Sequence, residues 1–187
     1  NALLAKTLQT AICVGDDSRL SVMVDNVAAS HSFPSGSGPD RRLWFEVRAF
    51  KGADAIYESG VLADGTSPAR STDPDLWLVR DCLFDDKGAE TSMFWSAASY
   101  DSNLLPAQLT FDPKDPRFYQ THLVRKYPAP PSYPDRVTLR VRLQPIGLDV
   151  LDDLIASGDL DPKYRATMPT LDVGGPVLVL RVDGLPL

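Results

Sequence analysis

Cysteine and histidine are scarce in this chain, which has two of each among its 187 residues. The cysteines, Cys13 and Cys82, lie far apart, and no Cys-x-x-Cys pair or cluster of cysteine and histidine occurs. The chain therefore lacks the ligand spacing of a thiolate zinc site and the pair of thiols that attaches a haem covalently. Two interpretations of the cysteines stay open, because residue alternation decides neither: two buried thiols, or one disulfide between strands.

Long hydrophobic runs are also absent. No stretch of about 20 apolar residues occurs, so the sequence predicts no membrane span. No leader of basic and then apolar residues precedes Asn1, so we expect any signal peptide to be absent or removed. The abrupt start at Asn1 leads us to expect one domain cut from a longer protein. The formal net charge of −6 argues against nucleic acid or an anionic membrane as a partner.

The motifs of common enzymes are missing. The sequence has no glycine-rich phosphate loop after a strand and no nucleophile elbow, and no pattern in it arranges a serine with His31 or His122 as a Ser-His-Asp triad. Asp112 and Asp115 could bind Ca²⁺, but a solvated turn is the more common use of such a pair. We therefore predict a protein with no catalytic residues and no metal site of its own.

Alternation of apolar and polar residues is the main structural signal. Hydrophobic residues make up 43% of the chain, and the sixteen prolines are spread along it, as in short strands joined by stiff loops. A stretch at 118–127 is ambiguous between helix and strand, and we interpret it as a strand. A helix is expected at 148–157, with Gly158 at its carboxyl end. The remaining expected strands are 7–14, 19–25, 43–50, 55–59, 76–84, 90–97, 136–144 and 177–182.

This pattern predicts an all-β fold. Short strands at close spacing with one late helix favour an antiparallel β-sandwich, Ig-like or jelly-roll-like, with long loops and one short C-terminal helix. Residues 1–187 are expected to form a single domain, because a chain of this length can bury roughly 70% of its unfolded surface around one core.

The segment at 31–42 is the one whose residue types indicate more than folding. His31 begins it, Pro34 fixes one φ angle, and Gly36 and Gly38 permit positive φ values. A pair of arginines, Arg41 and Arg42, then leads into an aromatic-rich strand.

A family resemblance rests on this segment. The pattern His-x-Phe-Pro-(Ser/Thr)-Gly, followed by arginine, an aromatic-rich strand and a Tyr-Glu-Ser-Gly end, resembles a β-sandwich domain that accompanies multihaem c-type cytochromes in bacteria. The resemblance implies a non-catalytic accessory or docking domain of an exported electron-transfer assembly, periplasmic or extracellular. Any haem c would belong to a missing domain or a partner protein. The matching residues are Asn26, His31, Phe33, Pro34, Gly36, Arg42, Trp44, Tyr57, Glu58, Ser59 and Gly60.

The resemblance implies that this segment is haem-facing, while the residues themselves fit a loop-organising role. His31 either pins the loop through hydrogen bonds or reaches out as the distal axial ligand of a haem in a neighbouring domain. Arg41 and Arg42 could face haem propionates, or could form a surface pair with Asp40 or Glu46.

An alternative function is a secreted module that binds carbohydrate or protein surfaces. Such a module needs several exposed aromatic residues on one face, and Trp44, Trp77 and Trp95 are the candidates. All three can equally be core residues, because each lies in an otherwise apolar stretch.

Overall fold

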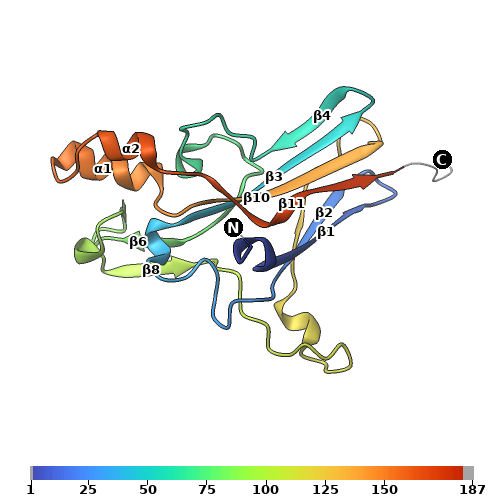
Figure 1. Ribbon diagram of the computed structural model, residues 1–187, viewed down its shortest axis with the longest axis horizontal. Coiled ribbons are helices and arrows are strands. Elements are labelled where there is room, and N and C mark those ends of the chain that lie inside the picture. Colours follow the sequence, from blue (N-terminus) through green and yellow to red (C-terminus); the bar gives the residue numbers. More distant parts are fainter. Residues whose placement is uncertain (1, 183–187) are drawn as a thin grey trace.

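The structure is a computed structural model that describes residues 2–182 (Figure 1). The strands are β1 (Leu8–Val14), β2 (Leu20–Asn26), β3 (Arg42–Lys51), β4 (Asp54–Ser59), β5 (Trp77–Val79), β6 (Asp81–Phe84), β7 (Glu90–Thr91), β8 (Ser99–Ser102), β9 (Leu123–Lys126), β10 (Arg136–Gln144) and β11 (Leu171–Arg181). The α-helices are α1 (Leu148–Ser157) and α2 (Lys163–Thr167). Short 3₁₀ turns are η1 (Leu4–Lys6), η2 (Gly38–Asp40), η3 (Pro68–Arg70), η4 (Phe94–Ser96) and η5 (Phe118–Thr121).

The largest sheet is antiparallel and is organised around β3. One edge of β3 pairs with β10 along the whole of β10, and β11 follows beyond it. The other edge of β3 pairs first with β5 and then with β4. Alternation along β3 and β10 sends one set of side chains inward and leaves Arg48, Arg140 and Arg142 on the outer face.

Two smaller antiparallel sheets complete the fold. In one, the order is β1-β2-β9; in the other, it is β7-β6-β8. The β1-β2-β9 sheet and the large sheet contribute to the same hydrophobic core, since Leu20 and Val22 of β2 join Phe45 and Val47 of β3 in one cluster. Burial of these side chains is the main force that holds the two sheets together.

Several predicted elements are confirmed. The strand at 136–144 and the helix at 148–157 have the predicted bounds. Gly158 ends α1 with a φ of 86°, a left-handed conformation that residues with a Cβ rarely adopt. Trp44 is only 4% exposed although it points to the outer face of β3, so that face is partly covered.

Other predictions are wrong. The strand expected at 76–84 is interrupted at Arg80, and the one expected at 90–97 ends at Thr91. The chain then turns through η4, because the amide of Ala98 donates to Phe84 and directs the following residues into β8 beside β6. The stretch at 118–127 begins as η5 and becomes a strand only at Leu123.

The structure also has a second helix, α2, which the sequence analysis missed. Asp161 accepts a hydrogen bond from the amide of Lys163 and precedes Pro162, which is a recognisable start signal for a short helix.

Candidate functional site

The loop at 27–41, called the His31 loop here, connects β2 to the large sheet. Its anchor is Asn26, which is 1% exposed at the end of β2. The Asn26 side-chain amide donates to the carbonyl of His31 at 2.8 Å, and its oxygen accepts from the amide of Ala29 at 3.2 Å. Asn26 therefore closes the first half of the loop, where no strand ladder satisfies the backbone groups.

A second anchor is the buried pair Phe33 and Pro34. The amide and carbonyl of Phe33 exchange hydrogen bonds with Leu105, both at 2.8 Å, and the Phe33–Pro34 peptide bond is cis. Phe33 belongs to the shared hydrophobic core. These contacts join the His31 loop to the segment that follows β8.

His31 itself is exposed. Its Nδ1 lies 3.1 Å from the carbonyl oxygen of the adjacent Ser32, which is the hydrogen bond that the structure records for the imidazole. The hydrogen bonds that hold the loop thus come from Asn26 and Phe33, while the imidazole is exposed to solvent.

Arg41 lies over Gly36. Gly36 has a φ of 85°, which favours glycine, and a Cβ built there would lie 3.1 Å from the movable end of the Arg41 side chain. Gly38 lacks the positive φ that the sequence analysis allowed; it is buried against the carboxylate of Asp81. Arg41 is half-buried, and the structure records no ion pair for it among residues 2–182.

Arg42 has the opposite environment. It is 2% exposed, and its Nη2 lies 2.6 Å from Oδ2 of Asp149 at the start of α1. Its Nη1 donates to the carbonyls of Pro39 and Arg41. The carboxylate that Arg42 pairs with is therefore Asp149, and not Asp40 or Glu46, which the sequence also offered as partners.

Asp149 completes this buried junction. Its second oxygen accepts from the hydroxyl of Ser67 at 2.6 Å, so the junction joins β3, α1 and the segment before η3. Burial alone would raise the pKa of Asp149, but hydrogen bonds from Arg42 and Ser67 outweigh burial and hold the pKa below its ordinary value. Gly147 packs beside the pair, and a Cβ built there would lie 2.9 Å from Cγ of Arg42.

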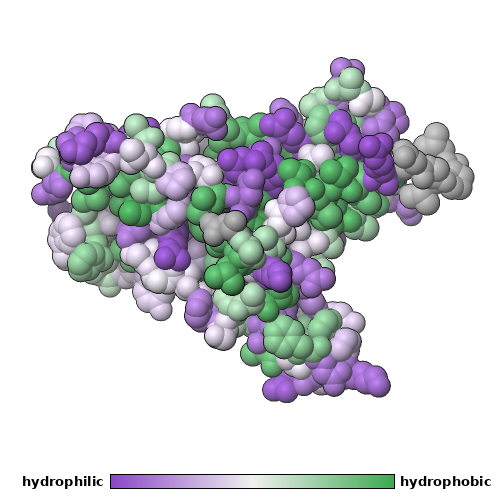
Figure 2. Space-filling view, viewed as in Figure 1, coloured by the Kyte–Doolittle hydropathy of each residue, from purple (hydrophilic) through white to green (hydrophobic). Residues whose placement is uncertain are grey.

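A projecting arm, residues 106–122, lies beside the His31 loop on the same side of the molecule (Figure 1). Phe111 of the arm and the backbone stretch from Val27 to Ser30 line a small pocket of about 240 Å³. Phe111 is 70% exposed, and Leu109 and Tyr119 are also exposed. Figure 2 shows hydrophobic residues among hydrophilic ones at the surface of this arm.

His122 holds the arm to the sheet. Its Nδ1 lies 2.5 Å from Oδ1 of Asp25 on β2, and both side chains are largely buried. Thr121 donates to the side-chain oxygen of Gln108 and closes the base of the arm. Sequence reasoning missed the arm, because Asp25 and His122 are 97 positions apart and no local pattern joins them.

The three tryptophans do not share an exposed face. Trp44 is buried and donates to the carbonyl of Gly60. Trp77 stacks on Phe45 at a ring distance of 4.1 Å. Trp95 alone of the three is largely exposed, at 66%. The aromatic platform that the carbohydrate-binding alternative needs is therefore not formed by these residues.

The cysteines are both free thiols. Cys13 is exposed on β1, and Cys82 is half-buried on β6, in a different sheet. The structure thus places neither a disulfide nor two buried thiols at these positions. Within residues 2–182, no cluster of three or more metal-ligating side chains occurs. No helix in this range combines the length and the apolar character needed to cross a membrane.

Comparison with known proteins gives one informative likeness. No protein-family profile and no curated protein sequence matches this chain. Among solved structures, the chain is similar to a penta-haem cytochrome c552 from Thermochromatium tepidum, with a TM-score of 0.65 and 14% sequence identity. The likeness covers 97% of this chain but 41% of the cytochrome chain. The comparison shows that the two proteins share a fold over nearly all of this chain.

Proposed function

We propose that this chain is a non-catalytic docking domain of an exported multihaem electron-transfer protein. The observation that carries the proposal is the shared fold with part of a penta-haem cytochrome, found for a chain whose His-x-Phe-Pro-Ser-Gly loop resembles the same class. Because this chain has no Cys-x-x-Cys-His motif, the haem is carried by another segment or by a partner. We interpret the two sheets around the shared core as the layers of a β-sandwich.

The docking surface consists of the His31 loop and the projecting arm. Leu109, Phe111 and Tyr119 expose apolar area on the arm, and large exposed apolar residues are typical of an interface. Phe111 also lines a pocket with residues 27–30 of the His31 loop. Asn26 and the Asp25–His122 pair hold the two segments on the same sheet, so the surface is presented in a fixed arrangement.

The residues that face a haem differ from those that the resemblance first implied. The His31 imidazole is exposed, so it fits a haem iron in an adjacent domain, and Arg41 carries a guanidinium without an ion pair that suits a propionate. Arg42 is excluded from this role by its buried pair with Asp149. A haem would supply the electron-transfer chemistry, and this chain would hold and orient it.

The test begins with the visible absorption spectrum of the native protein, purified from its source with any polypeptide that accompanies it. We expect a Soret band and sharp low-spin bands on reduction. In that protein, Phe111→Ser should weaken retention of the haem-bearing part, while Val179→Ser, which changes an exposed apolar residue on β11, should not. A featureless spectrum from a demonstrably complete protein would overturn the proposal.

The ligand role of His31 has a separate measurement. In the haem-containing protein, His31→Ala should shift the low-spin bands towards those of a five-coordinate haem. Unchanged bands would remove His31 as an axial ligand and leave it as a contact residue of the docking surface. His31 is exposed, so the variant is expected to fold and the spectrum can be interpreted directly.

A further inference from the structure

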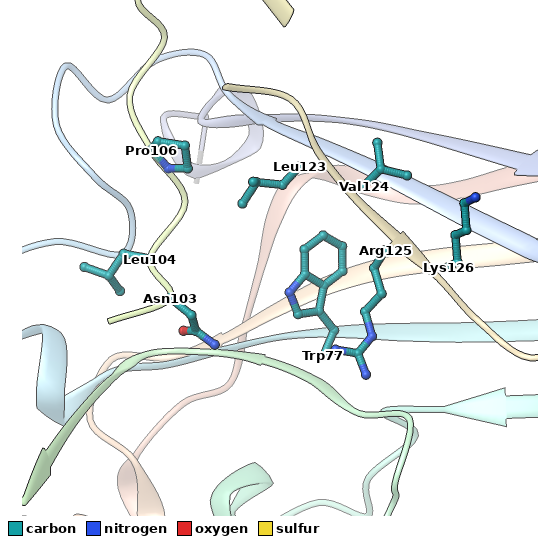
Figure 3. A pocket seen from close by; sticks show the side chains of 8 residues that line it. All are labelled: Trp77, Asn103, Leu104, Pro106, Leu123, Val124, Arg125 and Lys126. Atoms are coloured by element: carbon teal, nitrogen blue, oxygen red, sulfur yellow. The ribbon is translucent and has the colours of Figure 1, made fainter. Parts of the chain in front are cut away.

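A groove of about 650 Å³ runs along β9, next to the base of the projecting arm, which contributes Pro106 to its lining (Figure 3). Leu123, Val124, Arg125 and Lys126 of β9 line one side, and Trp77 of β5 lies opposite. The groove therefore lies between β9, at the edge of the β1-β2-β9 sheet, and β5 of the large sheet.

The backbone of β9 is unpaired on the side of this groove. β9 is the last strand of the β1-β2-β9 sheet, and within residues 2–182 no strand pairs with its outer edge. The amide of Tyr127 donates to the carbonyl of Leu20, which lies directly opposite it on β2. In antiparallel strands, pairs that exchange hydrogen bonds alternate with pairs that do not. The backbone groups of Val124 and Lys126 consequently point away from β2 and towards the free edge.

The side chains around the groove define what it can accept. Trp77, Leu104 and Pro106 give it an apolar surface (Figure 3). Arg125 donates to the backbone carbonyl of Asp75, and neither Arg125 nor Lys126 has a carboxylate partner among the residues described. Two cations without counter-charges beside an apolar groove are complementary to a segment that carries both apolar and acidic side chains, even though the whole chain is acidic.

We propose that this groove binds an extended peptide segment with alternating apolar and acidic side chains, which adds to the free edge of β9 as a further strand. The backbone groups of Val124 and Lys126 supply the main-chain hydrogen bonds. Trp77 packs against the apolar side chains, and Lys126 pairs with an acidic one. The site is separate from the His31 loop, so it does not depend on the cytochrome-related function.

The test is selection of nine-residue peptides from a random library displayed on phage against the 187-residue chain. Val124→Pro is the counter-selection variant, because proline removes an edge amide that makes no bond to β2; Val124→Thr keeps that amide and is its control. We expect enriched peptides to alternate and to contain Asp or Glu, and Val124→Pro to weaken their binding about tenfold. Failure to enrich peptides over the Val124→Pro background would overturn the proposal.

Two further measurements keep the test decisive if Val124→Pro disturbs folding. Lys126→Glu should weaken a selected peptide about tenfold, and Lys87→Glu, an exposed lysine in a turn, should leave its binding unchanged. Hydrogen exchange should show that the peptide protects the amides of Val124 and Lys126 in the unmodified chain. Selected peptides without acidic residues, or binding that leaves these amides unprotected, would overturn the proposal. So would self-association through β9, detected by sedimentation and abolished by Val124→Pro.

Discussion

Arg41 and Arg42 are neighbours in the sequence, but they belong to two regions that use polar groups in opposite ways. In the junction, Arg42 and Asp149 are buried and satisfy each other. In the His31 loop, the His31 imidazole is exposed and makes a hydrogen bond only to its neighbour Ser32, and Arg41 has no ion pair among residues 2–182. The charged residues of this segment therefore have two different uses. Arg42 stabilises the fold, whereas Arg41 is available to a partner.

The division follows from burial. A buried charge without a partner costs several kcal/mol, so the fold must supply Arg42 with a carboxylate and two carbonyl acceptors. An exposed imidazole or guanidinium stays hydrated and needs no such partner. Substitutions in the junction should therefore lower the free energy of unfolding much more than substitutions of the exposed residues in the His31 loop.

The largest effect is expected from Arg42→Ala. The change leaves the Asp149 carboxylate buried without its main partner, which costs about 3–5 kcal/mol of the free energy of unfolding. Arg41→Ala is the matched control and should change this free energy by less than about 0.5 kcal/mol. Urea unfolding monitored by tryptophan fluorescence measures both. Equal losses for the two variants would remove the contrast between the junction and the loop.

Asp149→Asn tests the Arg42–Asp149 pair through the pH dependence of the free energy of unfolding. At neutral pH the variant leaves Arg42 without an anion and should lose about 3 kcal/mol. The pKa of Asp149 is lowered in the folded state, so its contribution is present above the ordinary carboxyl pKa of about 4 and is lost as the pH falls through the folded value. The difference in the free energy of unfolding between the two proteins should therefore be constant above about pH 5 and should begin to shrink as the pH falls below about 4. A constant difference down to pH 3 would contradict the assigned role.

The two regions also differ in what the sequence could reveal. Alternation predicted β10 to the residue, because both neighbours of β10 impose the same period on its side chains. The helix α1 was predicted from its apolar stripe and Gly158, which are local signals. Neither signal depends on knowing which segments meet in space.

The junction and the arm could not be predicted in this way. Arg42 and Asp149 are 107 positions apart, and Arg41 is chemically identical to Arg42, so no local rule selects which arginine is buried. The strand predicted at 90–97 was wrong for a related reason. Met93, Phe94 and Trp95 form an apolar run, but η4 turns there and leaves Phe94 and Trp95 exposed. An apolar run forms a strand only where another strand lies beside it, and the local sequence does not show whether one does.

Asn26→Ala tests the boundary between the two regions. It removes the hydrogen bonds that close the His31 loop and should cost about 1–2 kcal/mol, because the carbonyl of His31 and the amide of Ala29 lose their partner. Faster hydrogen exchange at Ala29 should accompany the loss. Asn103→Ala, which removes hydrogen bonds from an exposed asparagine, should have a smaller effect. Unchanged exchange at Ala29 would show that Phe33 alone holds the loop.

The smallest effect is expected from His31→Ala. The imidazole is exposed and makes its one recorded hydrogen bond to the neighbouring carbonyl of Ser32, so the free energy of unfolding should change by less than about 0.5 kcal/mol. The same urea unfolding should be measured for His31→Ala and Asn26→Ala. The comparison distinguishes a residue that stabilises the loop, Asn26, from one that the loop only exposes, His31. A loss as large as that of Asn26→Ala would mean that His31 stabilises the loop after all. A negligible loss would show that the fold does not need the imidazole, which leaves it available for a contact outside the chain, as the docking proposal requires.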